Sequence, residues 1–281
     1  LFEGILRRLK IIVLKVTRCV GRGSDRLCCI GRMMRESSNM NGLLSLHKEL
    51  TQYASPAKAA LLARFFKTGK GEYAEGDAFL GVVVPDVRRI AKHYRDLPLQ
   101  EVSQLLNSGW HEERMTALFI LIDQYQRGSV KKQNAIYSLY IKNTEYINNW
   151  DLIDLTAGHI VGAHIANGHA KEATLFKFAQ SKSLWERRIA MLATFYCTKN
   201  GDARLALAIA ELLVHDTHDL IHKAVGWMLR EVGKRCSLKE EEGFLDKYAA
   251  TMPRTMLRYA IERFEPKKRE YYMRMKTKQT I

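Results

Sequence analysis

Four side chains able to take part in catalysis stand out in the second half of the chain: Trp150, Asp154, Arg188 and Trp227. Trp150 precedes Asp154 by four residues, so on a helix the two side chains share one face, a turn apart. A carboxylate stabilises positive charge, tryptophan faces attract cations and an arginine binds anions. From these residues alone two interpretations stay open. Either the four form a site, or Asp154 pairs with a basic neighbour and the tryptophans fill the core.

A sequence repeat determines how these residues are positioned. Its copies begin at Arg114, Asp151, Arg187 and Lys223, which are 37, 36 and 36 residues apart. A pair of helices fits this period, and stacked pairs of this kind build solenoids of the HEAT and tetratricopeptide types. The Trp, Gly and Tyr pattern of tetratricopeptide repeats is missing. We therefore predict an all-α, HEAT-like solenoid, with an up-and-down bundle as the alternative.

Apolar residues follow a helical period almost throughout the chain from Met40 onward, and no convincing period-two strand occurs. The predicted helices are Ala57–Lys67, Asp86–Tyr94, Leu99–Asn107, Glu112–Gln126, Lys131–Tyr146, Trp150–Ile165, Glu172–Ala179, Leu184–Cys197, Ala203–Val214, Leu220–Lys234, Lys239–Ala250 and Arg254–Phe264.

Asp154 breaks a rule that the repeat otherwise keeps. The fourth position of each copy holds Ala117, Asp154, Ala190 and Gly226. Three of these residues are small and permit close helix packing, whereas aspartate is a poor residue for a helix interior. If the repeats stack in register, the second helices line one concave surface, and this surface brings the four chemical side chains together.

Charge and cysteine content narrow the class of protein. The 281 residues include 45 Lys and Arg against 30 Asp and Glu, a net charge of +15, which favours a polyanionic partner such as nucleic acid over a membrane surface. No apolar run is long enough to span a membrane, so we expect a soluble protein. The five cysteines show no CxxC spacing, which disfavours a disulfide framework or a zinc ribbon and favours the cytoplasm.

Residues 1–39 differ from the rest of the chain. They carry nine Lys and Arg and three acidic residues, and glycines and serines interrupt them. We expect a basic N-terminal extension that is poorly ordered or not native, followed by one domain over residues 40–281 with a basic tail from about residue 265. A zincin-like stretch from His218 to His222 has Asp219 where the zincin motif has glutamate, so no metal site is predicted.

Four stretches together resemble the AlkD-type DNA alkylation-repair glycosylases. They are Phe79-Leu-Gly-Val-Val-Val-Pro-Asp-Val-Arg-Arg89, Asn149-Trp-Asp-Leu-Ile-Asp154, Leu184-Trp-Glu-Arg-Arg-Ile-Ala190 and His222-Lys-Ala-Val-Gly-Trp-Met-Leu-Arg-Glu231. The resemblance covers roughly Ala57 to Phe264 and keeps the order of the family. It implies a HEAT-like solenoid that wraps duplex DNA in a basic concave groove and removes cationic N3- or N7-alkylated purines.

The resemblance also assigns roles to single residues. Asp154 matches the catalytic aspartate of the family, Trp150 and Trp227 its groove tryptophans, and Arg188 its active-site arginine. Phe65 falls where the family contacts DNA with an aromatic ring, and Lys223 and Arg230 are expected to contact phosphates. No cofactor or metal is implied, and we expect a nucleoid-associated monomer. The alternative is a non-catalytic HEAT-like scaffold that binds DNA or protein.

Overall fold

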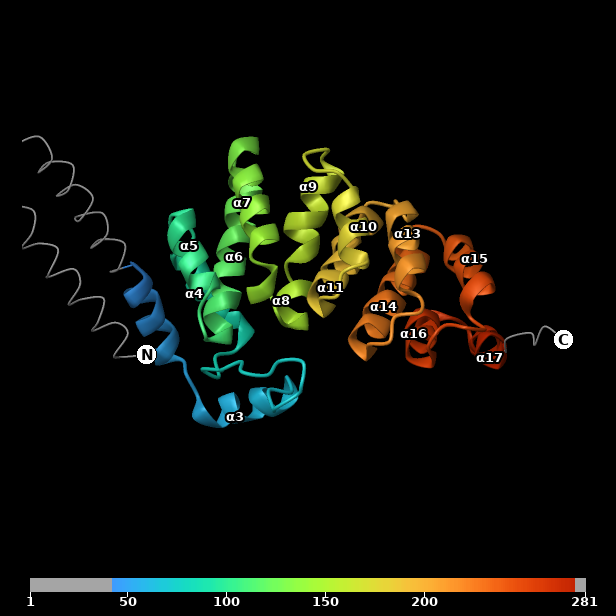
Figure 1. Cartoon of the computed structure of the whole chain (residues 1–281), viewed down its shortest axis with the longest axis horizontal. Helices are drawn as coiled ribbons and strands as arrows, with labels where there is room; N and C mark the ends of the chain where they lie inside the picture. Colours follow the sequence, from blue (N-terminus) through green and yellow to red (C-terminus); the bar gives the residue numbers. More distant parts are fainter. Residues whose placement is uncertain (1–41, 276–281) are drawn as a thin grey trace, which may run out of the picture. The chain divides into compact units, whose positions relative to one another are not determined.

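The computed structural model describes residues 42–275, and they are almost entirely helical (Figure 1). Within this range there is no β-strand, and a single isolated bridge joins Ala78 and Trp110. The helices follow one another as stacked pairs, so the predicted all-α helical-repeat fold is confirmed. No helix in the described range is long and apolar enough to cross a membrane.

The repeat helices from Glu49 onward form one unit built from two layers. Residues 42–52 are helical, and α3 (Pro56–Phe65) and α4 (Val84–His93) precede the pairs. The first helices of the pairs are α5 (Leu99–Leu106), α7 (Val130–Lys142), α10 (Ala173–Ala179), α13 (Arg204–Leu213) and α15 (Leu238–Tyr248). The second helices are α6 (His111–Arg127), α8 (Trp150–Asp154), α11 (Leu184–Ala193), α14 (Asp219–Arg235) and α16 (Arg254–Ala260).

The second helices form a continuous layer that carries the candidate site. Helix α8 contacts α6 and α11, and α14 contacts α11 and α16, which Figure 1 shows as neighbouring ribbons. The four repeat copies predicted from sequence begin on α6, α8, α11 and α14. Gly226 on α14 lies so close to α16 that a Cβ atom there would overlap the carbonyl oxygen of Met256. Small residues at this repeat position therefore do permit close helix packing.

Three helices predicted as continuous are interrupted, each at a residue whose side chain bonds to the backbone. The predicted helix 150–165 ends as α8 at Asp154 and resumes as a π-helix, η2 (Gly158–Gly162), followed by α9 (Ala163–Ala166). Between them, the Thr156 hydroxyl donates to the carbonyl of Leu152 at 2.5 Å. Side-chain hydrogen bonds of this kind compete with the helical pattern. The π-helix shifts every following side chain around the axis, which a regular period cannot predict.

Side-chain bonds to the backbone also lie where two other predicted helices are interrupted. The Thr194 hydroxyl donates to the Met191 carbonyl at 2.6 Å, and the helix predicted over 184–197 separates there into α11 and α12 (Phe195–Lys199). The Asn143 amide donates to the Leu139 carbonyl at 2.7 Å, where α7 gives way to the 3-10 helix η1 (Thr144–Tyr146).

The ends of the chain match the predictions less directly. The helix predicted over 254–264 ends as α16 and the 3-10 helix η3 (Ile261–Arg263). The predicted basic tail forms a further helix, α17 (Pro266–Arg274). Residues 1–39 lie outside the described residues, so the prediction of an N-terminal extension stays a prediction.

Candidate functional site

The centre of the candidate site is an ion pair between Asp154, the last residue of α8, and Arg188 on α11. The guanidinium Nε donates to Asp154 Oδ1 at 2.8 Å and Nη2 donates to Oδ2 at 2.7 Å. The third nitrogen, Nη1, donates to the Leu220 carbonyl at the start of α14, at 2.5 Å. Arg188 therefore joins three successive second helices and holds the carboxylate plane in one orientation.

Asp154 remains reachable although it is largely buried. Its side chain is 15% exposed, against 5% for Arg188. A carboxylate offers about four lone-pair positions, and Arg188 occupies two of them. Burial raises the pKa of Asp154, and the charge and hydrogen bonds of Arg188 act in the opposite direction. The arginine thus favours the anion in a place that otherwise disfavours charge.

An aromatic cluster surrounds Trp150, at the other end of α8. The Asn149 side chain caps this end of the helix, where its Oδ1 accepts the Trp150 amide at 2.8 Å. The indole lies edge-on to Phe65 of α3, with ring centroids 5.9 Å apart, and its Nε1 donates to the Tyr73 hydroxyl at 3.3 Å. Phe65 is 64% exposed. The structure therefore brings the predicted residues Trp150 and Phe65 together.

Buried charges beneath this cluster tie α6 to α8 and to the loop before α4. His111, the first residue of α6, lies between two carboxylates, with Nε2 2.9 Å from Asp151 Oδ2 and Nδ1 3.4 Å from Asp77 Oδ2. Asp77 also accepts a bond of 2.7 Å from Arg114. Burial lowers the pKa of His111, but the bonds to Asp151 and Asp77 outweigh it and raise the pKa to about 9. His111 is therefore a cation at neutral pH.

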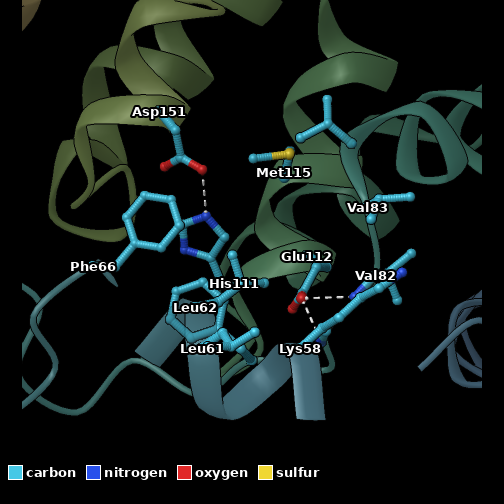
Figure 2. Close-up of a pocket in the computed structure, with 13 residues that line it drawn as sticks. Lys58, Leu61, Leu62, Phe66, Val82, Val83, His111, Glu112, Met115 and Asp151 are labelled. Atoms are coloured by element: carbon cyan, nitrogen blue, oxygen red, sulfur yellow. Dashed lines mark hydrogen bonds and ion pairs between the residues drawn. The ribbon is translucent and has the colours of Figure 1, made fainter. Parts of the chain in front are cut away.

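A hollow of about 320 Å³ lies beside His111 and Asp151 (Figure 2). Leu61 and Leu62 of α3, Phe66 and Met115 give it a mostly apolar lining. Figure 2 shows Asp151 bonded to His111 at one side and Glu112 bonded to the backbone near Val82 at another. Both carboxylates are engaged within the protein, so the hollow offers little polar surface for recognising a ligand.

The other three predicted residues lie on α14. Trp227 is half-buried, and its ring neighbour is Phe195 of α12, with centroids 6.3 Å apart. Lys223 pairs with Asp219 at 2.7 Å and stays 40% exposed. Arg230 pairs with Glu262. The structure thus joins Asp154 with Arg188 and Trp150 with Phe65, and it places Trp227 in a separate aromatic contact.

The zincin-like histidines have local structural partners. His218 is the N-cap of α14, where its Nδ1 accepts the Leu220 amide at 3.1 Å, and His222 Nε2 lies 2.5 Å from the Asp216 carbonyl oxygen. Within residues 42–275, no group of three His, Cys, Asp or Glu side chains is arranged to hold a metal ion.

Sequence reasoning missed several residues around Trp150. Tyr73 and Asp77 lie between the predicted helices Ala57–Lys67 and Asp86–Tyr94, and His111 has no motif of its own. Trp185, whose ring lies 5.9 Å from that of Tyr73, stands inside one of the quoted stretches and was passed over. Asp151 is the second residue of the Trp-Asp-x-x-Asp stretch, so its spacing to Asp154 was the available signal.

Comparison with known proteins identifies the family of the chain. The family model described as DNA alkylation repair enzyme matches residues 46–264. The chain belongs to this family. Asp154, Arg188 and both tryptophans lie within the matched range, so the membership supports a role in DNA repair.

Structural comparison supports the fold. A solved structure described as a predicted DNA alkylation repair enzyme from Enterococcus faecalis matches with a TM-score of 0.59 and 18% sequence identity. The match covers 76% of this chain and 97% of the other. At this identity the likeness concerns the fold alone. No curated protein gives a significant match.

Proposed function

We propose that this member of the DNA alkylation repair family is a monofunctional DNA glycosylase, which hydrolyses the N-glycosidic bond of cationic N3- or N7-alkylated purines in duplex DNA. The observation that carries the proposal is the carboxylate of Asp154, fixed by Arg188 and still 15% exposed, on the same short helix as Trp150. A carboxylate on a surface meant only to bind DNA would repel phosphates. A carboxylate at this position is explained if positive charge develops beside it during the reaction.

The chemistry requires little beyond such a carboxylate. An alkylated purine already carries a positive charge and leaves as a neutral base, so no general acid has to protonate it. As the bond breaks, positive charge moves to the sugar as an oxocarbenium ion, which an aspartate anion stabilises. The Asp154 carboxylate also orients the attacking water. The water becomes the C1′ hydroxyl of an abasic site, and no strand is cut.

The aromatic residues contribute to recognition. The Trp150 face next to a cationic base or sugar adds about 0.5–2 kcal/mol of attraction, depending on how far the pair is removed from water. Phe65 projects beside it and offers a ring surface to the duplex. The excess positive charge of the chain favours the DNA backbone as the partner, with a cytoplasmic, nucleoid-associated location.

The test is base release from a duplex with one N7-methylguanine, comparing the wild type with Asp154→Asn. A matched control is Asp216→Asn. The Asp216 carboxylate is also buried, with 8% of its side chain exposed, and it accepts a hydrogen bond of 2.7 Å from Nε of Arg187, the residue before Arg188. Asp154→Asn is expected to lose base release by more than ~100-fold while keeping duplex affinity, and Asp216→Asn to retain release.

Other outcomes separate the alternatives. Salt-sensitive DNA binding without release of N7-methylguanine or N3-methyladenine from the wild type would favour the non-catalytic scaffold. Equal loss of release in both variants, with lowered melting temperatures, would assign Asp154 a structural role.

A further inference from the structure

A second hollow, of about 290 Å³, is lined by residues of α4, α6 and the segment from Leu155 to His159. Leu155, which directly follows Asp154, lines it, and so does His159 of the π-helix. Its apolar floor includes Phe119 of α6. Leu155 thus connects this hollow to the segment of chain that carries Asp154.

Positive side chains dominate this hollow. Arg88 and Lys92, both exposed and one turn apart on α4, line it together with His159. The Arg88 guanidinium lies 4.2 Å from the centre of the Phe119 ring, and this stacking holds its position while its N–H groups stay free to donate. Among the described residues, no carboxylate pairs with Arg88 or Lys92.

The surroundings of His159 explain its charge state. Helix α4 contributes Arg88 and Lys92, α12 contributes Lys199, and α6 contributes Asp123, which already pairs with Arg127 at 2.6 Å. No charged side chain of α7, α9 or α11, the other described helices against η2, lines the hollow. Partial burial, and then the charges of Lys199 and Arg88, lower the pKa of His159. These effects disfavour the protonated form of His159, and a bound anion would favour it.

We propose that this hollow binds a backbone phosphate of the DNA duplex, held by Arg88, Lys92 and His159, and that His159 takes up a proton as the phosphate binds. The proposal rests on the proposed function, because it gives that function a phosphate contact at Leu155, the residue that follows Asp154. An anchored phosphate fixes the position of the duplex along the second helices without reading sequence.

Proton uptake by His159 makes the affinity for duplex DNA depend on pH. The free His159 has a lowered pKa, and a bound phosphate raises it, so between these two values binding consumes protons. Duplex affinity must then weaken as pH rises, by at most about tenfold per pH unit for one proton. A contact made only by arginine and lysine has no such dependence, since both stay charged over this range.

The experiment measures affinity of the full chain for an undamaged fluorescent duplex by anisotropy, from about pH 5.5 to 8 and over a range of salt concentrations. The wild type is expected to weaken several-fold over this pH range, and His159→Gln to lose that dependence. Arg88→Gln and Lys92→Gln are each expected to reduce the slope of log affinity against log salt by about one, and Arg88→Lys to restore it. Matched controls are His169→Gln and Lys132→Gln, exposed on other elements.

Two results would overturn the proposal: an unchanged pH dependence in His159→Gln, or salt slopes in both α4 variants equal to that of Lys132→Gln. Base release is measured alongside. If the wild type releases the base and the variants bind the duplex as the wild type does, the phosphate contact is refuted and the glycosylase proposal stands. Absence of release with altered binding refutes the glycosylase and leaves the phosphate contact standing.

Discussion

At the scale of single residues, Asp154 has a pKa raised above its ordinary value, because burial outweighs the opposing effect of Arg188. Burial raises the pKa of Asp154, and two hydrogen bonds from Arg188 counter that effect. The pair is also fixed from outside, because Arg188 donates to the Leu220 carbonyl. Removing one partner of a buried ion pair destabilises the folded protein by about 3–5 kcal/mol. Conservative substitutions, which keep the fold, therefore report best on the role of each residue.

Arg188→Lys should shift the pH dependence of base release. Lysine keeps the positive charge but lacks the planar fork that binds both carboxylate oxygens, so the pKa of Asp154 rises further. The reaction needs the anion, and activity is lost as pH falls through that pKa. The acidic limb of the pH–rate profile is therefore expected to move to higher pH. The control is Arg187→Lys; equal acidic limbs in wild type and Arg188→Lys would show that Arg188 does not set the charge of Asp154.

His111 should make stability depend on pH in the alkaline direction. Its pKa is raised from 6.5 to about 9 in the folded protein, so its contribution is complete below pH 6.5 and is lost as pH rises through about 9. The shift corresponds to a loss of up to roughly 3 kcal/mol. Urea unfolding at about pH 7 and about pH 10 measures it. The fall in unfolding free energy should be smaller in His111→Gln than in the wild type or in His169→Gln, and an equal fall in all three would contradict the assignment.

At the scale of elements, helix packing depends on a few positions where no side chain fits. Gly226 on α14 faces the backbone of α16, and Gly162 in the π-helix faces the Ala193 carbonyl in the same way. These contacts set the spacing of the second helices, and the spacing in turn places Arg188 within reach of both Asp154 and Leu220.

Two glycine substitutions separate packing from helix propensity. Gly226→Ala adds a methyl group against the Met256 carbonyl and should destabilise by about 1–3 kcal/mol. Gly243 lies inside α15, where nothing stands within 4 Å of an added Cβ atom, so Gly243→Ala should stabilise by about 0.5–1 kcal/mol. Chemical denaturation measures both. A Gly226→Ala variant as stable as the wild type would mean that α16 moves away from α14 without a loss of unfolding free energy.

The elements also show which features a single sequence can predict. Helices and their repeat follow from local periodicity, and Pro85, Pro98 and Pro253 lie at helix starts, where proline is tolerated. The π-helix escaped prediction because it leaves the apolar pattern of the sequence unchanged.

Contacts between distant segments of the chain were the other feature that the sequence did not predict. The bonds of Asp77 with His111 and Arg114 start from a loop that precedes the first repeat copy, so the repeat does not indicate them. The Asp154–Arg188 pair spans one repeat, so the repeat did indicate it. The sequence left a pair with a basic neighbour as an alternative to function, and the geometry shows that the two interpretations are compatible.

At the scale of the whole molecule, a stack of helical pairs has unequal local stability. Each pair contacts only its neighbours, so the ends of the described stack have fewer partners than the middle. Helix α3 has no buried residue, and α17 has a single one, Tyr272. Helices α6 and α14, by contrast, bury side chains along most of their length.

Hydrogen exchange read by mass spectrometry should follow this order. Amides of α3 and α17 should exchange fastest, and those of α6 and α14 slowest, because local opening is cheapest where least apolar surface is exposed by it. Uniform protection across these four helices would instead indicate one cooperative unit.

Adding duplex DNA should then protect α3 selectively. Phe65 on α3 touches Trp150 and is largely exposed, so a duplex seated against Trp150 covers α3 as well. Helix α15, an outer helix of the last pair, serves as the control. Protection that rises in α3 and stays constant in α15 would place the DNA on the second-helix side near Asp154. The opposite pattern would place the duplex on the outer layer, and the roles proposed for Trp150 and Phe65 would have to be withdrawn.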